Sequence, residues 1–178
     1  SLGREPRDWL LAHDFVPDDL RAPWKSAADL ALQGVARCYA RAGALRTLRL
    51  HGDCHAGNVL WTEGGPHFVD FDDARTGPAV QDLWMLLSGD RPAMEKQLGH
   101  VLEGYRQFRE FDERELALVE ALRTLRLLHY AAWIARRWDD PAFPAAFPWF
   151  NTQRYWQDRI LELREQIALM DEPPLAAP

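Results

Sequence analysis

The chain has 178 residues, of which 47% are hydrophobic and 27% are charged, and its formal net charge is −6. This composition is typical of a globular domain with its own core, and the negative charge argues against a general binder of nucleic acids or anionic membranes. The apolar runs are too short to span a membrane, and no signal-peptide pattern opens the chain, so neither a nucleic acid nor a membrane is an expected partner.

The N-terminal part of the chain is predicted to be irregular at first and then helical. Three prolines fall within the first 25 residues, which we expect to be irregular or only partly helical. A helix is predicted from about Ala27 to Ala42, because apolar residues recur on one face and Gly43 is a suitable stop. The two cysteines, Cys38 and Cys54, fit free thiols in a reducing compartment, the cytoplasm, with a disulfide between them as the alternative.

A short β section is predicted next. Leu48 and Leu50 lead into a loop that begins at His51. Residues 59–61 and 67–71 are predicted to pair as a hairpin, because the Glu-Gly-Gly-Pro sequence between them favours a turn.

The rest of the chain is predicted to be helical. Apolar residues at helical spacing indicate helices at about 78–88, 92–109 and 152–170. Asp112 and Glu115 resemble a capping box, which would start a further helix that ends near Trp138. The segment 140–150 breaks the pattern, and the tail from Pro173 is expected to be frayed. The predicted fold is therefore mainly α with a small β-hairpin, and we expect a monomer.

The strongest chemical signal is the run HGDCHAGN at residues 51–58. A His-x-Asp sequence followed by four residues and Asn has the spacing of the kinase catalytic loop. Phosphoryl transfer needs a carboxylate that orients the acceptor hydroxyl and takes its proton, and such a base contributes about 10²–10⁴-fold to the rate. Asp53 is therefore the predicted catalytic base.

Two further residues are predicted to bind magnesium beside the ATP phosphates. Asn58 follows Asp53 after a turn of small residues, which would let its amide oxygen reach back to a metal ion. Asp70 ends the second predicted strand and opens an Asp-Phe-Asp triplet that corresponds to the Asp-Phe-Gly of kinases. Mg²⁺ prefers oxygen ligands and keeps several waters, so one amide and one carboxylate suffice. Asp70 is therefore predicted to be catalytic as well as a metal ligand.

The loop residues also have less specific interpretations. Asp53 and Asn58 could merely cap a turn. His51 and His55 could suggest a zinc site, although no Cys or His partners recur at ligand spacing elsewhere. We expect instead that His51 braces the loop through a backbone hydrogen bond.

Acidic residues after the hairpin have alternative roles as well. Asp82 could be an acid favoured by a helix dipole, or it could accept amide hydrogen bonds from the His51–Asp53 loop. We favour the second interpretation, in which Asp82, like His51, gives structural support. Asp72 and Asp73 could help to hold a second metal ion.

Two other segments could have a functional role. Five arginines could bind phosphate or an acidic substrate, namely Arg114, Arg123, Arg126, Arg136 and Arg137. A solvated helix face with intrahelical Glu pairs is the favoured alternative. The aromatic segment from Phe143 to Phe150 could line a substrate pocket or pack over the core.

The runs HGDCHAGNVLW, FVDFDDARTGPAVQDLWMLL, RRWDDPAFPAAFPWF and EPPL resemble the aminoglycoside-phosphotransferase-like superfamily. Within it they are similar to the stress response kinase A family of cytoplasmic bacterial Ser/Thr protein kinases. The resemblance covers the chain from about Leu48, and the first 45 residues carry little of it. It implies the C-terminal lobe of a protein-kinase-like α+β fold, with ATP as co-substrate and a role in the stress response. It also implies that Asp53 accepts the proton, and that Asn58 and Asp70 bind Mg²⁺.

Members of that family have an N-terminal lobe with a phosphate-covering loop and an ATP-anchoring lysine. This chain has only Lys25 and Lys96, and neither follows a glycine-rich strand pair. We therefore expect residues 1–178 to be the C-terminal catalytic lobe without the nucleotide-clamping lobe. Such a fragment would bind ATP weakly and would not turn over.

Three functions compete at this point. A protein kinase that phosphorylates Ser or Thr is favoured by the family resemblance. A small-molecule kinase that acts on an alcohol or an aminoglycoside-like substrate is the alternative, because the 11 residues between Asp70 and Asp82 leave no room for a long protein-docking segment. A non-catalytic binding module is disfavoured, because Asp53, Asn58 and Asp70 are all present.

Overall fold

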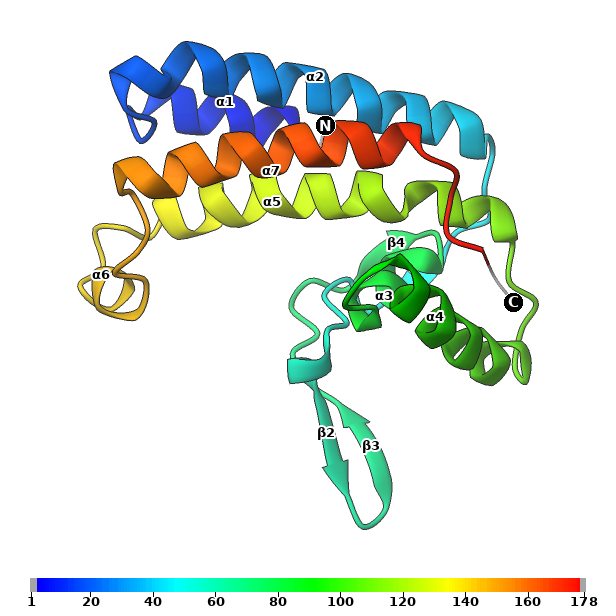
Figure 1. The fold of residues 1–178 in the computed structure, drawn as a ribbon. Coiled ribbons are helices and arrows are strands. Elements are labelled where there is room, and N and C mark those ends of the chain that lie inside the picture. The colour runs from blue at the N-terminus through cyan, green and yellow to red at the C-terminus, as the bar shows by residue number, and fades with distance from the viewer. Residues whose placement is uncertain (1–2, 177–178) are drawn as a thin grey trace. The chain divides into compact units, whose positions relative to one another are not determined.

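A computed structural model describes residues 3–176, which divide into two compact units. Of these residues, the first unit holds 3–39 and 120–172, and the second holds 40–119 and 173–176. Residues 40–119 of the second unit are therefore inserted in the sequence between the two halves of the first. The fold is mainly helical with two small antiparallel sheets, which confirms the predicted fold class (Figure 1).

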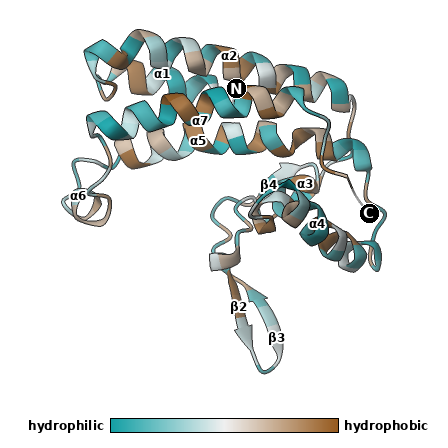
Figure 2. Cartoon of the chain, viewed as in Figure 1, coloured by the Kyte–Doolittle hydropathy of each residue, from teal (hydrophilic) through white to brown (hydrophobic). Residues whose placement is uncertain are grey.

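The first unit is a helical bundle with one continuous core. Its main helices are α1 (Arg4–Ala12), most of α2 (Asp18–Ala42), α5 (Val119–Ala135) and α7 (Gln153–Asp171). These helices run side by side, and apolar bands follow α5 and α7 (Figure 2). Trp24 and Trp156 meet edge to face at the centre, with ring centroids 5.7 Å apart and both side chains buried. An aromatic pair in this geometry contributes about 0.5–1.5 kcal/mol beyond the area that it buries.

The first 25 residues, predicted to be irregular or only partly helical, are more helical than expected. Residues 4–12 form α1, and α2 begins at Asp18, nine residues before the predicted start. Pro23 lies inside α2 and removes one backbone donor from the helix. The neighbouring Trp24 is almost fully buried in the core. Burial of a large aromatic side chain outweighs the lost hydrogen bond, so the local proline signal is overridden by packing.

The aromatic segment at 143–150 packs over the bundle core. It contains the short helix α6 (Ala142–Ala146), and Phe150 is buried among the core residues. Phe143 and Phe147 are half-buried against the same core, whereas Trp149 is exposed. Of the two roles considered for this segment, the contacts support packing.

The second unit holds two separate two-stranded sheets. In one sheet, β1 (Leu48–Leu50) pairs antiparallel with β4 (Arg75–Gly77). In the other, β2 (Val59–Thr62) and β3 (Gly65–Phe68) form the predicted hairpin, with a turn at Glu63-Gly64. The second strand ends at Phe68 and not at Phe71 as predicted. β4 was not predicted, because three residues with no hydrophobic pattern give no strand signal.

Short helical segments complete the second unit. They are η1 (Ala56–Asn58), α3 (Val80–Leu83), η2 (Trp84–Leu86), α4 (Arg91–Arg106) and η3 (Glu113–Leu118). The helix predicted at 78–88 is thus a short α-helix followed by a 3₁₀ turn. Half of the predicted capping box is present, because the Asp112 side chain caps η3 by accepting from Arg114 N at 3.1 Å. The Glu115 side chain does not complete the box. Its carboxylate is 3% exposed and accepts a hydrogen bond from Val80 N at 2.8 Å, which caps α3.

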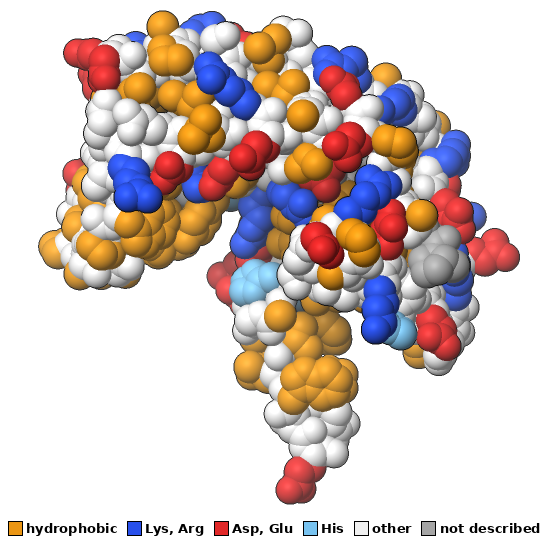
Figure 3. Space-filling model, viewed as in Figure 1, with side chains coloured by type: hydrophobic (Ala, Val, Ile, Leu, Met, Phe, Trp, Pro, Cys, Tyr) orange, Lys and Arg blue, Asp and Glu red, His pale blue; other side chains and the backbone are white. Residues whose placement is uncertain are grey.

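Three further features concern a membrane, the tail and the hairpin. Within the described residues, the helices are too short or too polar to cross a membrane. The tail predicted to be frayed is instead bound along α4 as far as Ala176, through hydrogen bonds to Arg91 and Glu95. The hairpin carries exposed hydrophobic side chains, and Trp61 is 77% exposed (Figure 3).

Candidate active site

The carboxylate of Asp82 holds the loop that follows β1. Asp82, on α3, accepts hydrogen bonds from His51 N at 2.7 Å and from Gly52 N at 2.8 Å. The two oxygens of one side chain therefore bind two consecutive amides. This is the contact expected of Asp82 from the sequence, and it fixes the backbone just before Asp53.

Gly52 lies where no other residue fits without strain. Its φ is +91°, and a Cβ at this position would come within 2.1 Å of the Asp73 carbonyl oxygen. The Gly52 carbonyl accepts hydrogen bonds from Arg75 Nη2 at 3.1 Å and from Gln81 Nε2 at 3.3 Å. The loop is thus pressed against residues 73–75. No role was predicted for Gly52 from the sequence. The glycine between His51 and Asp53 could have indicated a backbone conformation that other residues rarely adopt.

His51 connects the loop to the strand that precedes Asp70. Its side chain is buried, and Nε2 lies 2.8 Å from the Val69 carbonyl oxygen. Because a carbonyl can only accept, Nε2 carries the proton. The other ring nitrogen, Nδ1, accepts a hydrogen bond from Asp53 N at 3.4 Å. His51 therefore makes backbone hydrogen bonds on both sides, as a brace would.

Asn58 is buried, and its amide group is oriented by the loop. Nδ2 donates to the Asp53 carbonyl oxygen at 3.0 Å, while the Asn58 carbonyl accepts from Val69 N at 3.1 Å. With the amide nitrogen directed at the loop backbone, Oδ1 is the atom of this side chain that could meet a cation. The predicted pair of Asp53 and Asn58 is thus brought together by a direct hydrogen bond.

Asp70 follows a residue that is held by two hydrogen bonds, and its own backbone conformation is unusual. Its neighbour Val69 is held at the amide by Asn58 and at the carbonyl by His51. Asp70 itself has φ +64°, in the left-handed region that Asp, Asn and Gly tolerate best. Its side chain is exposed. The hydrogen bonds at Val69 therefore tie the start of the Asp70 turn to the loop that carries Asp53.

His55 points its second ring nitrogen at Asp53. Its Nδ1 accepts a hydrogen bond from Gly57 N at 3.0 Å, so in the neutral ring the proton is on Nε2. That Nε2 lies 3.6 Å from Asp53 Oδ2. This distance is longer than a hydrogen bond, but it places a donor beside the carboxylate that is predicted to act as base.

The remaining acidic residues do not form a metal cluster. Asp72 and Asp73 are exposed, and Asp73 faces Arg75 at 3.6 Å. Across residues 3–176, no three His, Cys, Asp or Glu side chains are placed together to hold a metal ion. Neither a second metal at Asp72 and Asp73 nor zinc at the two histidines has support from this geometry. The donor chemistry of Asn58 and Asp70, one amide and one carboxylate oxygen, does fit Mg²⁺.

The predicted arginine face is largely occupied by neighbours. Arg114 pairs with Asp112, and Arg123 pairs with Glu120 one turn away. Arg136 pairs with Glu5 of α1, and Arg137 stacks over Trp133 with its guanidinium 4.5 Å from the ring centroid. These contacts favour the structural interpretation over a phosphate site.

Cys54 is expected to resist alkylation at neutral pH. Burial raises the pKa of this thiol, and the negative charges of Asp82 and Asp53 raise it further. A raised pKa means that less thiolate is present at a given pH. The reaction with iodoacetamide should therefore become rapid only at a pH above the usual pKa of a cysteine thiol. Peptide mapping by mass spectrometry over a pH series measures the rate. Asp53→Asn should speed the reaction, and a rate equal to that of the denatured chain at pH 7 would contradict the expectation.

Asp82→Asn is expected to destabilise the loop by about 2 kcal/mol, because the NH₂ group cannot accept one of the two amide hydrogen bonds. Thermal unfolding followed by circular dichroism measures the loss. Asp90→Asn is the matched control: Asp90 caps α4 by accepting from Ala93 N at 3.0 Å, and Asn caps equally well. An equal effect of the two variants would show that Asp82 does not hold the loop.

Comparison with known proteins gives a consistent result. The sequence matches the phosphotransferase enzyme family over residues 2–119. It is 48% identical over 171 residues to a stress response kinase A of Salmonella choleraesuis and to the serine/threonine protein kinase RdoA of Salmonella typhimurium. It is 47% identical to a stress response kinase A of Escherichia coli K12. These matches confirm the resemblance predicted from the sequence.

The extent of the similarity differs from the prediction in one respect. The aligned 171 residues are 96% of this chain, so most of the first 45 residues are included, contrary to our expectation. They are 51% of each of these relatives. The chain therefore spans about half the length of the curated relatives that it matches.

Proposed function

Because the chain belongs to the phosphotransferase enzyme family, we propose that it forms the catalytic-loop half of an ATP-dependent kinase that phosphorylates Ser or Thr side chains of proteins. One observation carries the proposal. Asp53 and Asn58 are joined by a hydrogen bond in a loop that Asp82 and His51 brace. His51 and the Asn58 carbonyl also hold Val69, the residue before Asp70. Phosphoryl transfer depends mainly on positioning and electrostatics, which a braced loop of this kind supplies.

In this proposal Asp53 acts on the acceptor hydroxyl. Its carboxylate orients the hydroxyl and takes the proton as the hydroxyl oxygen bonds to the γ-phosphorus of ATP. The bond from that phosphorus to the β–γ bridging oxygen breaks, and ADP leaves. His55, whose Nε2 faces Asp53 Oδ2, would help to fix the orientation of the carboxylate.

Asn58 and Asp70 would hold Mg²⁺ through their side-chain oxygens. The ion, when bound, neutralises charge that develops on the phosphates. The chain prepares for it by two means. The Asn58 amide nitrogen donates a hydrogen bond to the Asp53 carbonyl oxygen. Asp70, with its left-handed backbone, directly follows Val69, whose N–H and carbonyl are both hydrogen-bonded.

The choice of acceptor rests on the relatives. One of them is named as a serine/threonine protein kinase, which supports a protein substrate for this chain as well. The alternative is a kinase for a small alcohol. It is favoured by the short path from Asp70 to Asp82, part of which is taken up by β4 in its pairing with β1. A segment held in this way offers little chain for docking a protein.

Further properties follow from the same proposal. The nucleotide clamp would come from the part of the relatives that this chain does not cover, so the 178-residue chain alone should bind ATP weakly and transfer no phosphate. The reduced thiols of Cys38 and Cys54 support a reducing compartment, the cytoplasm. We expect the protein to act as a monomer.

The test uses labelled ATP and a protein that joins this chain to the portion that its relatives have in addition. The preparation is offered a generic protein substrate, itself and a panel of small alcohols. Label in Ser or Thr residues supports the proposal, and label only in a small alcohol supports the alternative. No transfer to any acceptor, with ATP binding intact, would contradict both.

A further inference from the structure

The tail of the chain is bound by two side chains of α4. Arg91 donates from Nη1 to the Pro173 carbonyl at 3.0 Å and from Nη2 to the Pro174 carbonyl at 2.6 Å. Glu95 accepts from Ala176 N at 3.0 Å, and it also accepts from Arg91 Nε at 3.0 Å. The two side chains therefore orient each other, and each makes hydrogen bonds to backbone atoms of the tail.

The sequence of the tail suits this kind of recognition. Two consecutive prolines favour an extended backbone whose carbonyls are not paired within the segment itself, so the guanidinium of Arg91 can bind two of them. The next residue, Leu175, is only 7% exposed, so it acts as an apolar anchor. Proline-containing segments are suited to binding in grooves, because their extended conformation is already formed and little conformational entropy is lost.

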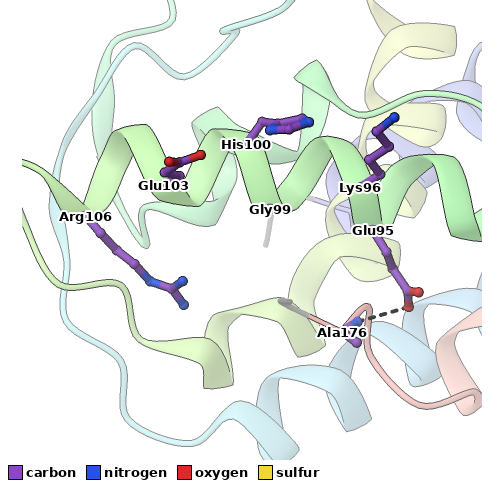
Figure 4. A pocket seen from close by; sticks show the side chains of 7 residues that line it. All are labelled: Glu95, Lys96, Gly99, His100, Glu103, Arg106 and Ala176. Atoms are coloured by element: carbon purple, nitrogen blue, oxygen red, sulfur yellow. Dashed lines mark hydrogen bonds between the residues drawn. The ribbon is translucent and has the colours of Figure 1, made fainter.

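The described part of the tail, which ends at Ala176, meets one end of a longer hollow. A cavity of about 760 Å³ continues along α4 from Ala176 (Figure 4). Its lining consists of Glu95, Lys96, Gly99, His100, Glu103, Arg106 and Ala176. Gly99 has no side chain, so the helix backbone forms part of the floor. A cavity of this volume is within the range of ligand sites in proteins.

We propose that this face of α4 is a recognition groove for an extended Pro-Pro-Leu peptide segment, and that the chain's own tail is its occupant in cis. The reading residues are Arg91 for the two proline carbonyls and Glu95 for the amide after the leucine. A ligand that continues past the leucine would run along the hollow beyond Ala176. The proposal does not depend on the phosphotransfer activity.

The affinity can be bounded by the connection of the tail to α7. A tethered segment meets its own chain at an effective concentration on the order of 1 mM, so occupancy of the groove in cis requires a dissociation constant no weaker than about 1 mM. Binding of this strength is measurable by NMR with a free peptide, and a longer ligand could displace the tail.

The first experiment measures recognition in trans. A chain that ends at Glu172 is titrated with the capped peptide Glu-Pro-Pro-Leu-Ala while its amide chemical shifts are recorded. Shift changes confined to α4 are expected, and Arg91→Ala should weaken the binding at least tenfold. Arg106→Ala is the matched control, because Arg106 lines the far end of the hollow and should not affect this short peptide. Equal binding of a scrambled peptide, or shifts outside α4, would overturn the proposal.

A second measurement uses the intact chain and covers the case that the shortened chain does not fold. Hydrogen exchange at the Ala176 amide should be slowed by its bond to Glu95, and Arg91→Ala should accelerate the exchange about tenfold. The same substitution should leave exchange in the β2–β3 hairpin unchanged. An Ala176 amide that exchanges at the rate of an unstructured peptide in the intact chain would show that α4 does not bind the tail.

Discussion

Asp53→Asn is expected to lower the rate of phosphotransfer by about 10²–10⁴-fold without a change in the fold, because an amide has nearly the size of a carboxylate but cannot take the acceptor proton. The bracing of the loop should survive the substitution. Asn58 binds the main-chain carbonyl of residue 53, and Asp82 binds the amides of residues 51 and 52, so neither contact uses the Asp53 side chain.

The measurement is the initial rate of label transfer from ATP in the longer protein described above. Asp72→Asn is the matched control: it removes an exposed acid two residues after Asp70, and it should leave the rate within about a factor of two, since surface changes have small effects. Thermal unfolding of both variants should match that of the unmodified protein. Equal rates for Asp53→Asn and the unmodified protein would remove Asp53 from the catalytic role.

Gly52→Ala is expected to destabilise the second unit by about 2–5 kcal/mol, the sum of left-handed backbone strain and an overpacked contact. The new methyl group would lie 2.1 Å from the Asp73 carbonyl oxygen, and that atom belongs to the backbone and cannot rotate away. The loop would have to move, and the hydrogen bonds from Arg75 and Gln81 to the Gly52 carbonyl would be lost with it.

A glycine-to-alanine change elsewhere in the same unit should act in the opposite direction. Gly104 lies in α4, and a Cβ there would have no neighbour within 4 Å. Gly104→Ala should stabilise the helix by about 0.5–1 kcal/mol. Urea unfolding followed by tryptophan fluorescence and circular dichroism compares the two variants. If Gly52→Ala were as stable as Gly104→Ala, the close approach of residues 52 and 73 would be incorrect.

Much of the fold could be predicted because its signals are local. The helical pattern of α4 and α7 and the turn chemistry of the β2–β3 hairpin gave bounds within a few residues of those observed. Where prediction failed, the deciding contact was distant in sequence. The burial of Trp24 carries α2 through Pro23, and Glu115 caps α3 from 35 residues away.

The site divides in the same way. The spacing of Asp53 and Asn58 is a local motif, so it could be read directly, and so could the Asp70 that follows the hairpin. The residues that hold the site in place were harder to find, because β4 pairs with β1 across the whole hairpin and Arg75 reaches back to Gly52. Strand pairing of three residues and a single arginine contact leave no periodic pattern in the sequence.

The interrupted order of the first unit has a consequence for biosynthesis. Residues 40–119, which carry the whole candidate active site, are contiguous, whereas the bundle needs segments from both sides of them. Domains fold as units while the ribosome delivers the chain from the N-terminus. The site-bearing unit can therefore begin to fold while α1 and α2 still wait for α5 and α7. Until those helices emerge, the apolar faces of the first two lack the side chains of α5 and α7 that bury them in the folded unit.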